Sequence, residues 1–546
     1  MNPVHVIPRD HSTLAAAYLA SARCFGDRDA IKPIGQPAIR YDELFTRVKT
    51  AVSVLSEFGL KPGEKIAICL PNCPEWAVFT YAAALMGLCI IPVNVRYRAD
   101  EMELILAGSD ASCLVTQKSF MTNAFVDRLS EIAKGQVGSG ETAAIASLPA
   151  LRRILLVDGG SVPGMVDYRK AAAKVRHEVD VERLAGERHA DEPLYLFWTS
   201  GTTSAPKGAL LPQSSIDQIW AWTTLAGYRN DDRVLTARPF FYIAGNFWTL
   251  VAPMLYGALS VISDELSSEQ MQQLCLENQV TVLNGNPLMM KKIIEDPGYD
   301  RRAFAHIRMG MFGGSSMPAD ELMRIKQEIG YTDFLQTYGM TEFAGFVLST
   351  RPGDSIEATV NTCGLPFTDV QMKLVNSETG AEVAKGEPGM VVVKGIKLIR
   401  YLNLTEVDHR KLFDDEGWYR TGDLMLERPD GRYEFVGRSK DLIKVNGENA
   451  TAADIESSLM KHPSINLAAV IGRPDAARGE VPVAFLEAKG GRPTDHALKA
   501  WCKNKMAPYK VPVEFHWVLP EAWPMTISGK IAKHRLMAEA AQGSTP

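Results

Sequence analysis

Residues 194–212 read LYLFWTSGTTSAPKGALLP, a polar run between two apolar ones. The composition of LYLFW (194–198) predicts a strand, and GALLP (208–212) returns to apolar character. The polar residues between them therefore form a loop that joins two ordered segments. Gly201 lets a ligand approach the backbone closely, and hydroxyls with successive N–H groups can surround phosphate oxygens. Lys207 adds a compact positive charge.

The order of residues in this loop differs from that of the common phosphate-binding loop. That loop has the pattern G-x-x-x-x-G-K-[ST], with glycine before the lysine and a hydroxyl after it. Here Pro206 precedes Lys207 and Gly208 follows it. A Ser/Thr/Gly loop that only turns the chain is the alternative. Taken alone, the loop is therefore either a phosphate cradle of another kind or a plain turn.

Length and composition set the outer limits. A chain of 546 residues is too long for one ordinary core, so two or more domains are expected. The formal net charge of −5 gives no electrostatic reason to expect nucleic acid or an anionic membrane as partner. Eight scattered cysteines without a CxxC pair argue against a zinc site or a disulfide framework and are typical of a reducing compartment.

One stretch is long enough to span a bilayer. Residues 76–95, WAVFTYAAALMGLCIIPVNV, carry no charge. Gly87 and Pro92 divide the stretch into a helix and a short strand, which favours a buried helix that leads into a buried parallel strand. The N-terminal residues also lack the pattern of a secretory signal. We therefore expect no transmembrane span and a cytoplasmic location.

The chain changes character along its length. Short apolar runs between turn residues predict strands at 65–71, 112–117 and 153–158. Residues 246–263 repeat the helix–glycine–strand order of 76–95, which indicates two related α/β subdomains with parallel sheets. The alternative is that this order of elements simply recurs in any α/β protein. Residues 370–395 have alternating patterns of residue character and tight glycine turns, which are typical of antiparallel β structure.

Helix and strand patterns alternate again from about residue 437. We therefore expect a large N-terminal domain, 1–436, with two parallel α/β subdomains and a small β-barrel-like part. A small mobile α+β domain, 437–546, follows it.

The loop closely resembles the signature of the adenylate-forming superfamily, which reads approximately [ST]-S-G-[ST]-T-G-x-P-K-G. Ser204 stands where that family usually has glycine. Further family motifs follow in the same order along nearly the whole chain. They are MGMFGGSSMP (309–318), QTYGMTE (336–342), GWYRTGD (417–423), GRSKDLIKVNGEN (437–449) and PMTISGKIAKHRL (524–536). The chain is therefore similar to acyl-CoA synthetases, peptide-synthetase adenylation domains and beetle luciferases.

The resemblance implies a two-step reaction that uses ATP, Mg²⁺ and coenzyme A. A carboxylate attacks the α-phosphorus of ATP and releases pyrophosphate, and CoA then displaces AMP. Negative charge concentrates in the first step, so positioned cations and N–H donors are expected to dominate catalysis. The residues implied as catalytic are Lys530, Glu342, Thr341 and Lys207, with Glu342 and Thr203 at the metal. The residues implied for ATP and AMP are Thr199, Ser200, Gly201, Thr202, Thr203, Lys207, Gly314, Ser315, Thr337, Tyr338, Gly339, Met340, Thr341, Asp423, Arg438 and Lys530.

The resemblance also implies where the acid and CoA bind. The acyl pocket is expected to draw on Tyr242, Asn246, Phe247, Asn286, Met289, Phe312, Gly313, Met340 and Phe346. Tyr242 replaces the usual histidine of P-x-x-H-x-x-G, and tyrosine is not a cation near pH 7. The mostly apolar set, without Asp or Lys, favours a neutral medium-chain, alicyclic or aryl acid. For CoA the residues are Lys444, Asn446 and Gly447, and Lys440 occupies the hinge about which the C-terminal domain rotates.

Several alternatives stay open at this point. YGMTE, RPGD and GEN look most like bacterial acyl-CoA ligases that include carnitine- and betaine-type enzymes. An adenylation enzyme that loads a free-standing carrier protein and a luciferase-like oxygenase would use the same adenylate. A non-catalytic nucleotide-binding protein would not need all of the charged residues named above. We expect small-molecule partners and no nucleic acid, and we leave a homodimer open.

Overall fold

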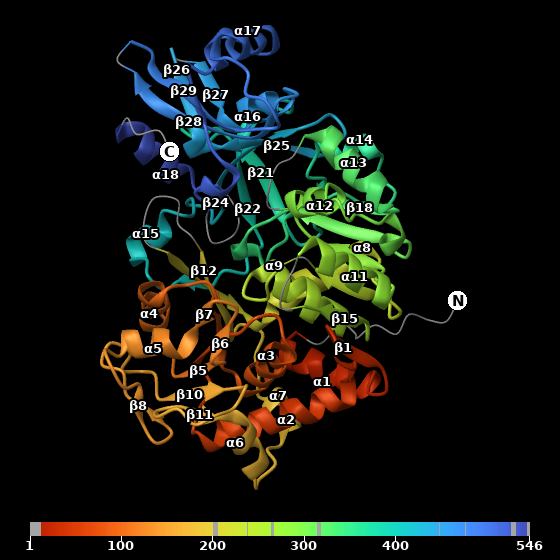
Figure 1. The fold of residues 1–546 in the computed structure, drawn as a ribbon, viewed down its shortest axis with the longest axis vertical. Helices are drawn as coiled ribbons and strands as arrows, with labels where there is room; N and C mark the ends of the chain where they lie inside the picture. Colours follow the sequence, from red (N-terminus) through yellow and green to blue (C-terminus); the bar gives the residue numbers. More distant parts are fainter. Residues whose placement is uncertain are drawn as a thin grey trace.

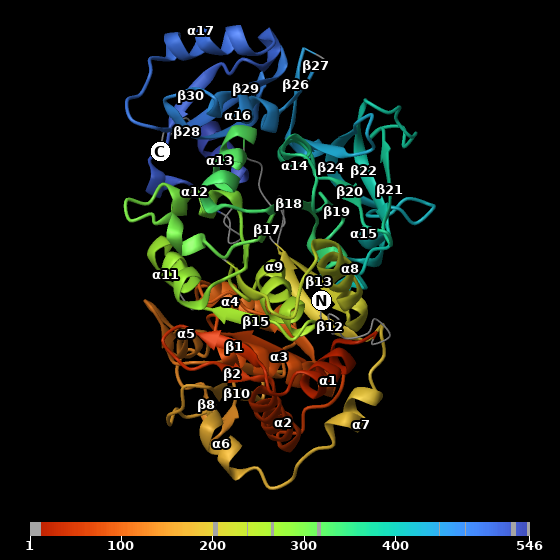
Figure 2. The same cartoon turned by 90° about the vertical axis from the view of Figure 1, so that its right-hand side faces the viewer.

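The computed structural model describes residues 12–199, 206–236, 238–263, 267–313, 318–446, 448–475, 477–525 and 531–542. These residues form two large mixed sheets, a smaller antiparallel sheet and a C-terminal α+β unit (Figure 1). In Figure 2 the C-terminal unit lies at the opposite end of the molecule from the first sheet.

The first sheet contains the hairpin around the polar loop. Its strands run parallel except for β13, which pairs antiparallel with both β12 and β23 at one edge. The order is β11 (Val166–Asp167), β10 (Arg153–Leu156), β5 (Cys113–Thr116), β3 (Lys65–Cys69), β4 (Cys89–Pro92), β12 (Pro193–Thr199), β13 (Lys207–Pro212) and β23 (Arg400–Tyr401). The strands predicted at 65–71, 112–117, 153–158 and 194–198 are confirmed. Thr199 pairs with Lys207, so the polar loop joins two antiparallel strands.

The second sheet has a parallel centre and antiparallel edges. Its order is β2 (Ile39–Arg40), β1 (Asp29–Pro33), β15 (Leu259–Ile262), β14 (Arg233–Thr236), β16 (Val282–Asn284), β17 (Met309–Gly313), β18 (Asp333–Tyr338), β19 (Leu348–Ser349) and β20 (Leu365–Pro366). The two parallel subdomains are therefore confirmed. The helical part expected at 246–263 is interrupted: α9 (Ile243–Asn246), a π-helical turn (Phe247–Val251) and α10 (Ala252–Met254) follow one another.

Helices cover both sheets and bury their apolar faces. Helix α3 (Pro74–Met86) is buried on nearly every side, and Gly87 ends it in a left-handed conformation with φ 67°. Tyr81 donates a hydrogen bond of 2.9 Å to the Leu250 carbonyl, which ties α3 to the second subdomain. The apolar length of 76–95 therefore reflects burial between subdomains. Within the described residues, no helix is long and apolar enough to cross a membrane.

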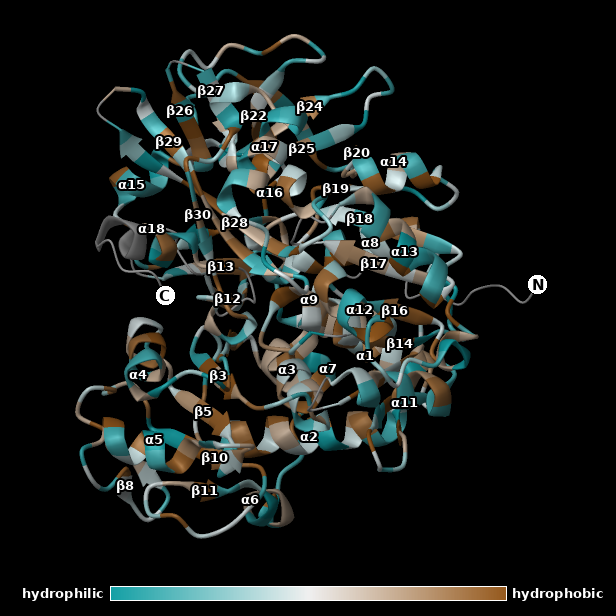
Figure 3. Cartoon of the chain, turned by 45° about the horizontal axis from the view of Figure 1, so that its top comes forward, coloured by the Kyte–Doolittle hydropathy of each residue, from teal (hydrophilic) through white to brown (hydrophobic). Residues whose placement is uncertain are grey.

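Two hydrophobic clusters lie on opposite faces of the second sheet. Met311 and Leu335 belong to the cluster shared with the first subdomain, whereas Phe312 and Phe334 belong to the other. Adjacent residues of a strand point to opposite faces, which explains the division. Helices α11 (Ser268–Asn278), α12 (Pro287–Ile294) and α13 (Ala319–Ile329) cover the outer cluster, and α8 (Ile216–Ala226) packs in the inner one. Figure 3 shows how apolar and polar residues are distributed along these elements.

The remaining helices of the N-terminal part lie mainly around the first sheet. They are α1 (Leu14–Cys24), α2 (Tyr41–Glu57), α4 (Ala99–Gly108), α5 (Phe125–Ile132), α6 (Tyr168–Lys174) and α7 (Val181–Gly186), with α14 (Ile356–Asn361) and α15 (Glu406–Arg410) farther along the chain. The β-barrel-like part is an antiparallel sheet of β21 (Gln371–Val375), β22 (Pro388–Lys394), β24 (Tyr419–Glu427) and β25 (Tyr433–Arg438). This sheet confirms the antiparallel pattern predicted for 370–395.

The C-terminal unit has its own sheet and core. The sheet contains β27 (Glu448–Thr451), β26 (Leu442–Val445), β29 (Gly479–Ala488) and β28 (Ile465–Asp475), with β30 (Glu514–Trp517) beside β29. Helices α16 (Ala452–Met460) and α18 (Lys533–Gln542) pack against β28, and α17 (Asp495–Lys505) packs against α16. A separate hydrophobic cluster, which includes Ile455, Val470 and Leu486, gives this unit a core of its own.

Candidate active site

Several of the expected site residues lie where strands of the second sheet end. Strands β14, β16, β17 and β18 are parallel, so the loops that follow them meet at one edge of the sheet. Ligands of open α/β sheets bind at this carboxyl edge. Tyr242, Asn286, Gly313 and Thr337 lie at or just beyond these strand ends. The edge therefore brings together residues that lie up to about a hundred positions apart in the sequence.

Part of the site lies outside the described residues. The predicted residues concerned are Ser200, Gly201, Thr202, Thr203, Gly314, Ser315, Gly447 and Lys530, together with the side chain of Lys440. The roles expected for them stay predictions.

The exit of the polar loop is fixed by one amide side chain. The side-chain amide of Asn403 donates to the carbonyl of Pro206, and its oxygen accepts from the N–H of Gly208 at 3.2 Å. Thr199 closes the hairpin through a 3.3 Å bond from its hydroxyl to the Lys207 carbonyl. The Lys207 ammonium lies 5.8 Å from the centre of the Tyr401 ring, a cation–π arrangement. The lysine is thus held over the residue that contacts Glu342.

Glu342 is a buried carboxylate. It lies on the short 3₁₀ turn Thr341–Phe343 that follows β18, and only 6% of its surface is exposed. The Tyr401 hydroxyl donates to Glu342 Oε1 and lies 3.3 Å from the Tyr419 hydroxyl. Burial raises the pKa of Glu342, while the Tyr401 hydrogen bond and the Lys207 charge act in the opposite direction. Sequence reasoning missed Tyr401, because no local pattern connects it with a residue 59 positions earlier.

Asp423 forms the second polar centre. It is 4% exposed, and its carboxylate accepts a 2.6 Å hydrogen bond from the Tyr338 hydroxyl. Its other oxygen, Oδ1, lies 3.0 Å from Nε of Arg438, which faces it across the β24–β25 pair. The structure therefore brings Tyr338, Asp423 and Arg438 together from three strands. Carboxylate oxygens of this kind accept hydrogen bonds from sugar hydroxyls.

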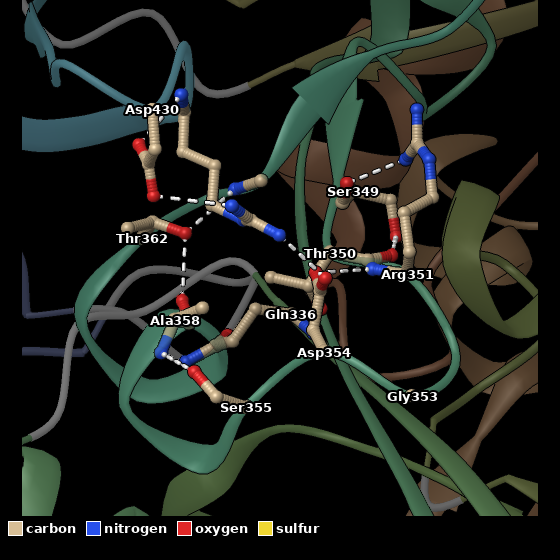
Figure 4. A network of polar contacts seen from close by, with 12 residues as sticks. Gln336, Ser349, Thr350, Arg351, Gly353, Asp354, Ser355, Ala358, Thr362 and Asp430 are labelled. Atoms are coloured by element: carbon tan, nitrogen blue, oxygen red, sulfur yellow. Dashed lines mark hydrogen bonds and ion pairs between the residues drawn. The ribbon is translucent and has the colours of Figure 1, made fainter.

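A polar network connects the second sheet with the β24–β25 hairpin of the antiparallel sheet (Figure 4). Arg432, in the turn between β24 and β25, donates to Asp354 Oδ1 at 2.6 Å. The other oxygen of Asp354 accepts from the N–H of Arg351 at 2.8 Å, and Thr350 accepts from the N–H of Gln336 on β18 at 2.9 Å. The network thus connects the strand of Tyr338 with the hairpin of Asp423.

The turn that carries Glu342 is tightly packed. A Cβ atom at Gly339 would lie 2.0 Å from the carbonyl oxygen of Gly345. This overlap involves backbone atoms, so only a shift of the backbone could relieve it. Ala344 takes a left-handed conformation with φ 53°. Met340 and Thr341 are half-buried between these two points. The glycine of YGMTE is therefore required by close approach of backbone to backbone.

The expected acyl residues do not all share one place. Phe346 is fully buried and stacks on Trp222, with ring centres 5.0 Å apart, and on Trp248 at 6.4 Å. Phe312 packs in the outer cluster, 4.3 Å from Phe334, on the other face of the sheet. The structure therefore separates the side chain of Phe312 from Phe346, because strand alternation directs it away.

Other acyl residues take part in local packing. Asn246 is buried and accepts a 2.8 Å hydrogen bond from Tyr195, and Phe247 packs 5.5 Å from the same ring. Asn286 caps α12 through a 2.7 Å bond from the N–H of Met289. Tyr242 accepts a 3.4 Å hydrogen bond from Asn94, and burial raises the pKa of its phenol, which is therefore neutral near pH 7.

Lys444 and Asn446, which are expected to meet CoA, lie on and directly after β26 of the C-terminal unit. The ammonium of Lys444 is 3.6 Å from Glu378, in the loop after β21, and both side chains are largely exposed. Asn446 is exposed with φ 51°, and its N–H bonds to the Arg478 carbonyl. The described contacts of these two residues include none with Glu342 or Asp423. Their role at CoA stays a prediction.

Comparison with known proteins gives a consistent result. A family model for AMP-binding enzymes matches residues 19–401, and a model for the C-terminal domain of AMP-binding enzymes matches 454–530. The mitochondrial medium-chain acyl-CoA ligase ACSF2 of Danio rerio is 29% identical over 541 residues, 97% of this chain and 88% of the relative. ACSF2 of Mus musculus is 28% identical over 552 residues, with the same shares covered.

A solved structure has the same fold. The anthranilate CoA ligase AuaEII, in complex with anthranoyl-AMP, superposes with a TM-score of 0.85 over 97% of this chain and 98% of that chain. The sequences are 23% identical, so this likeness concerns the fold.

Proposed function

Because the chain belongs to the AMP-binding enzyme family, we propose that it is an ATP-dependent carboxylate–CoA ligase that works through an acyl-adenylate. One observation carries the proposal. The buried Glu342 beside Lys207 and the Tyr338–Asp423–Arg438 centre converge at the carboxyl edge of the second sheet. Lys207 suits charged phosphates, Glu342 suits the Mg²⁺ that accompanies them, and the second centre suits a ribose, so a single nucleotide accounts for both centres.

The reaction has two balanced steps. A carboxylate oxygen of the acid attacks the α-phosphorus of ATP, a new P–O bond forms, and the bond to pyrophosphate breaks. The sulfur of CoA then attacks the carbonyl carbon, the C–O bond to AMP breaks, and the thiol proton passes to solvent. Lys207 offsets negative charge during the first step, and Lys530 is proposed to contact the carboxylate and the α-phosphate.

Glu342 fits a role at Mg²⁺. Carboxylate oxygens are ligands that Mg²⁺ prefers, and the ion often takes only one or two of them from protein beside phosphates and water. Consistent with this, the described ranges contain no group of three or more His, Cys, Asp or Glu side chains that could hold a metal. When bound, the ion would supply positive charge to the phosphates, and Tyr401 would orient the carboxylate that holds it.

The substrate proposed is a medium-chain, alicyclic or aryl acid. The similarity to the medium-chain acyl-CoA ligase ACSF2, 29% identical over 97% of this chain, supports it. We further propose that residues 437–546 rotate as one unit about Lys440 between the two steps. A homodimer and a cytoplasmic location stay predictions from the sequence; the unpaired state of all eight cysteines agrees with a reducing compartment.

A panel of carboxylic acids tests the proposal. Each acid is incubated with the protein, ATP, Mg²⁺ and CoA, and AMP and acyl-CoA are measured by mass spectrometry. We expect both products in equal amounts with at least one acid. AMP without acyl-CoA for every acid would favour a carrier protein as acceptor or an oxygenase. The absence of AMP with every acid would refute a ligase.

A further inference from the structure

Arg238 is a charged residue at the candidate active site that the mechanism above does not use. It follows β14 at the carboxyl edge, four residues before Tyr242. Its Nη2 donates a 2.9 Å hydrogen bond to the carbonyl of Gly313, at the end of β17. Its guanidinium carbon lies 5.7 Å from the centre of the Trp248 ring. The guanidinium is therefore located between Gly313, at the end of β17, and the ring of Trp248.

This charge has no partner of opposite sign among the described residues. The ion pairs of the described chain do not include Arg238, and its Nε is buried without a hydrogen-bond acceptor. Burial lowers its pKa to about 10, so the group stays positive near neutral pH. The nearest titratable group that interacts with it, the phenol of Tyr242, is neutral there. A guanidinium carries five N–H donors, and described residues accept one hydrogen bond from it.

Arg238 is half-buried, and a partly desolvated charge without a counter-ion is costly, because pairing and hydrogen bonds are what offset desolvation. The face of Trp248 and one carbonyl provide partial charges only. A bound anion would supply what is missing. Guanidinium groups match carboxylates especially well, because two parallel N–H groups can bind both oxygens.

The backbone holds Arg238 in place. Asn72 donates to the Arg238 carbonyl at 3.3 Å and accepts from the N–H of Phe240 at 2.8 Å. A Cβ atom at Gly245 would lie 2.0 Å from the Pro239 carbonyl oxygen, so α9 begins directly against this segment. The position of the arginine is therefore set by the fold.

We propose that the acid substrate carries a second carboxylate besides the one that reacts, and that Arg238 binds it. The proposal rests on the ligase function above and narrows its substrate to dicarboxylic acids with an aryl or medium-length skeleton. The distal carboxylate meets the guanidinium of Arg238 between the Gly313 carbonyl and the ring of Trp248. The expectation of a neutral acyl group considered Asp and Lys and overlooked this arginine.

Matched acids test the proposal. Benzoate is compared with terephthalate, and octanoate with octanedioate, in the AMP-release assay. The wild-type protein is expected to use one dicarboxylic acid with a kcat/KM at least tenfold above that of its monocarboxylic partner. Arg238→Met should lower the value for the diacid roughly 10- to 100-fold, the range of a hydrogen bond between charged groups, and change that for the monoacid little.

Two further variants separate binding from folding. Arg238→Lys keeps the positive charge but lacks the two parallel N–H groups of the guanidinium. This variant should retain part of the preference for the diacid. Arg302→Met removes an exposed arginine whose side chain is 87% accessible. This control variant should leave kcat/KM unchanged for both acids of each pair. Melting temperatures of the variants show whether each is folded. If Arg238→Met lowers kcat/KM equally for both acids of a pair, the arginine has a structural role. If the equal loss is accompanied by weaker ATP binding, the arginine contacts the nucleotide. Either result overturns the proposal, as does a wild-type protein that prefers the monoacid in every pair.

A binding measurement tests the role of Arg238 independently of catalysis. Calorimetric titration of terephthalate and octanedioate into wild-type protein and Arg238→Met needs no turnover. Weaker diacid binding by the variant supports the proposal even if no acid yields AMP, which would refute the ligase function alone. No binding of either diacid to the wild type, or equal binding by both proteins, would refute the role of Arg238.

Discussion

Removal of one hydroxyl, in Tyr401→Phe, tests how Glu342 is held. Tyr401 and Glu342 are 5% and 6% exposed, so water cannot readily replace the lost donor. A hydrogen bond to a charged group contributes about 1.5–3 kcal/mol, and the variant leaves a buried carboxylate oxygen without its partner. We therefore expect the free energy of unfolding to fall by about 1.5–3 kcal/mol at neutral pH. If the carboxylate also turns from its catalytic position, kcat/KM for ATP falls roughly 10- to 100-fold.

The pH dependence gives a sharper result than the size of the loss. Burial raises the pKa of Glu342, and the Tyr401 hydrogen bond lowers it by favouring the ionised form. The ionised form is the one that can hold Mg²⁺, so activity is lost as the pH falls through the pKa. Without Tyr401 the pKa rises further, and the acid limb of the pH–rate profile moves to higher pH. The loss of stability should shrink toward low pH, where protonated Glu342 no longer carries a buried charge.

The assays are a pH–kcat/KM profile with varied ATP and thermal unfolding across the same pH range. Tyr256→Phe is the matched control, since it removes a buried hydroxyl that bonds Thr223 at 3.2 Å. The control should lose about 0.5–1.5 kcal/mol and leave the acid limb unchanged. An acid limb that moves to lower pH in Tyr401→Phe, or that stays in place, would refute the assigned hydrogen bond.

Three other variants test separate parts of the site. Asp423→Asn removes the charge between Tyr338 and Arg438, so KM for ATP should rise about 10- to 100-fold while KM for the acid changes little; the reverse pattern would contradict a ribose site. Lys530→Ala should abolish adenylate formation and largely spare thiolation of supplied acyl-adenylate, and equal loss in both half-reactions would contradict two conformations. Gly339→Ala places a Cβ atom 2.0 Å from a backbone oxygen and should destabilise the protein by about 1–3 kcal/mol in chemical denaturation, whereas Gly491→Ala, with open space around it, should not.

Local patterns were sufficient for the broad architecture. The strands at 65–71 and 194–198 and the helix–strand break at Gly87 were predicted correctly, because apolar runs and glycine stops act over a few residues. The interrupted helix around 247–251 was not predicted, since Pro253 follows an apolar run that gives no sign of a π-helical turn. The family resemblance indicated Glu342 and Asp423, but it left Tyr401 unrecognised as the partner of Glu342.

The sequence by itself determined the order of the motifs, the alternation of helix and strand, and the kinds of side chain available for phosphate, ribose and acid. Those properties depend on short stretches of chain. Only the tertiary structure decided that Tyr401 reaches Glu342, 59 residues away, and that Tyr338 reaches Asp423, 85 residues away. It also decided that Phe312 faces away from Phe346 and that Arg238 lacks a counter-ion among its described neighbours. Strand register and sheet packing set these contacts, and both result from the burial of surfaces distant in sequence.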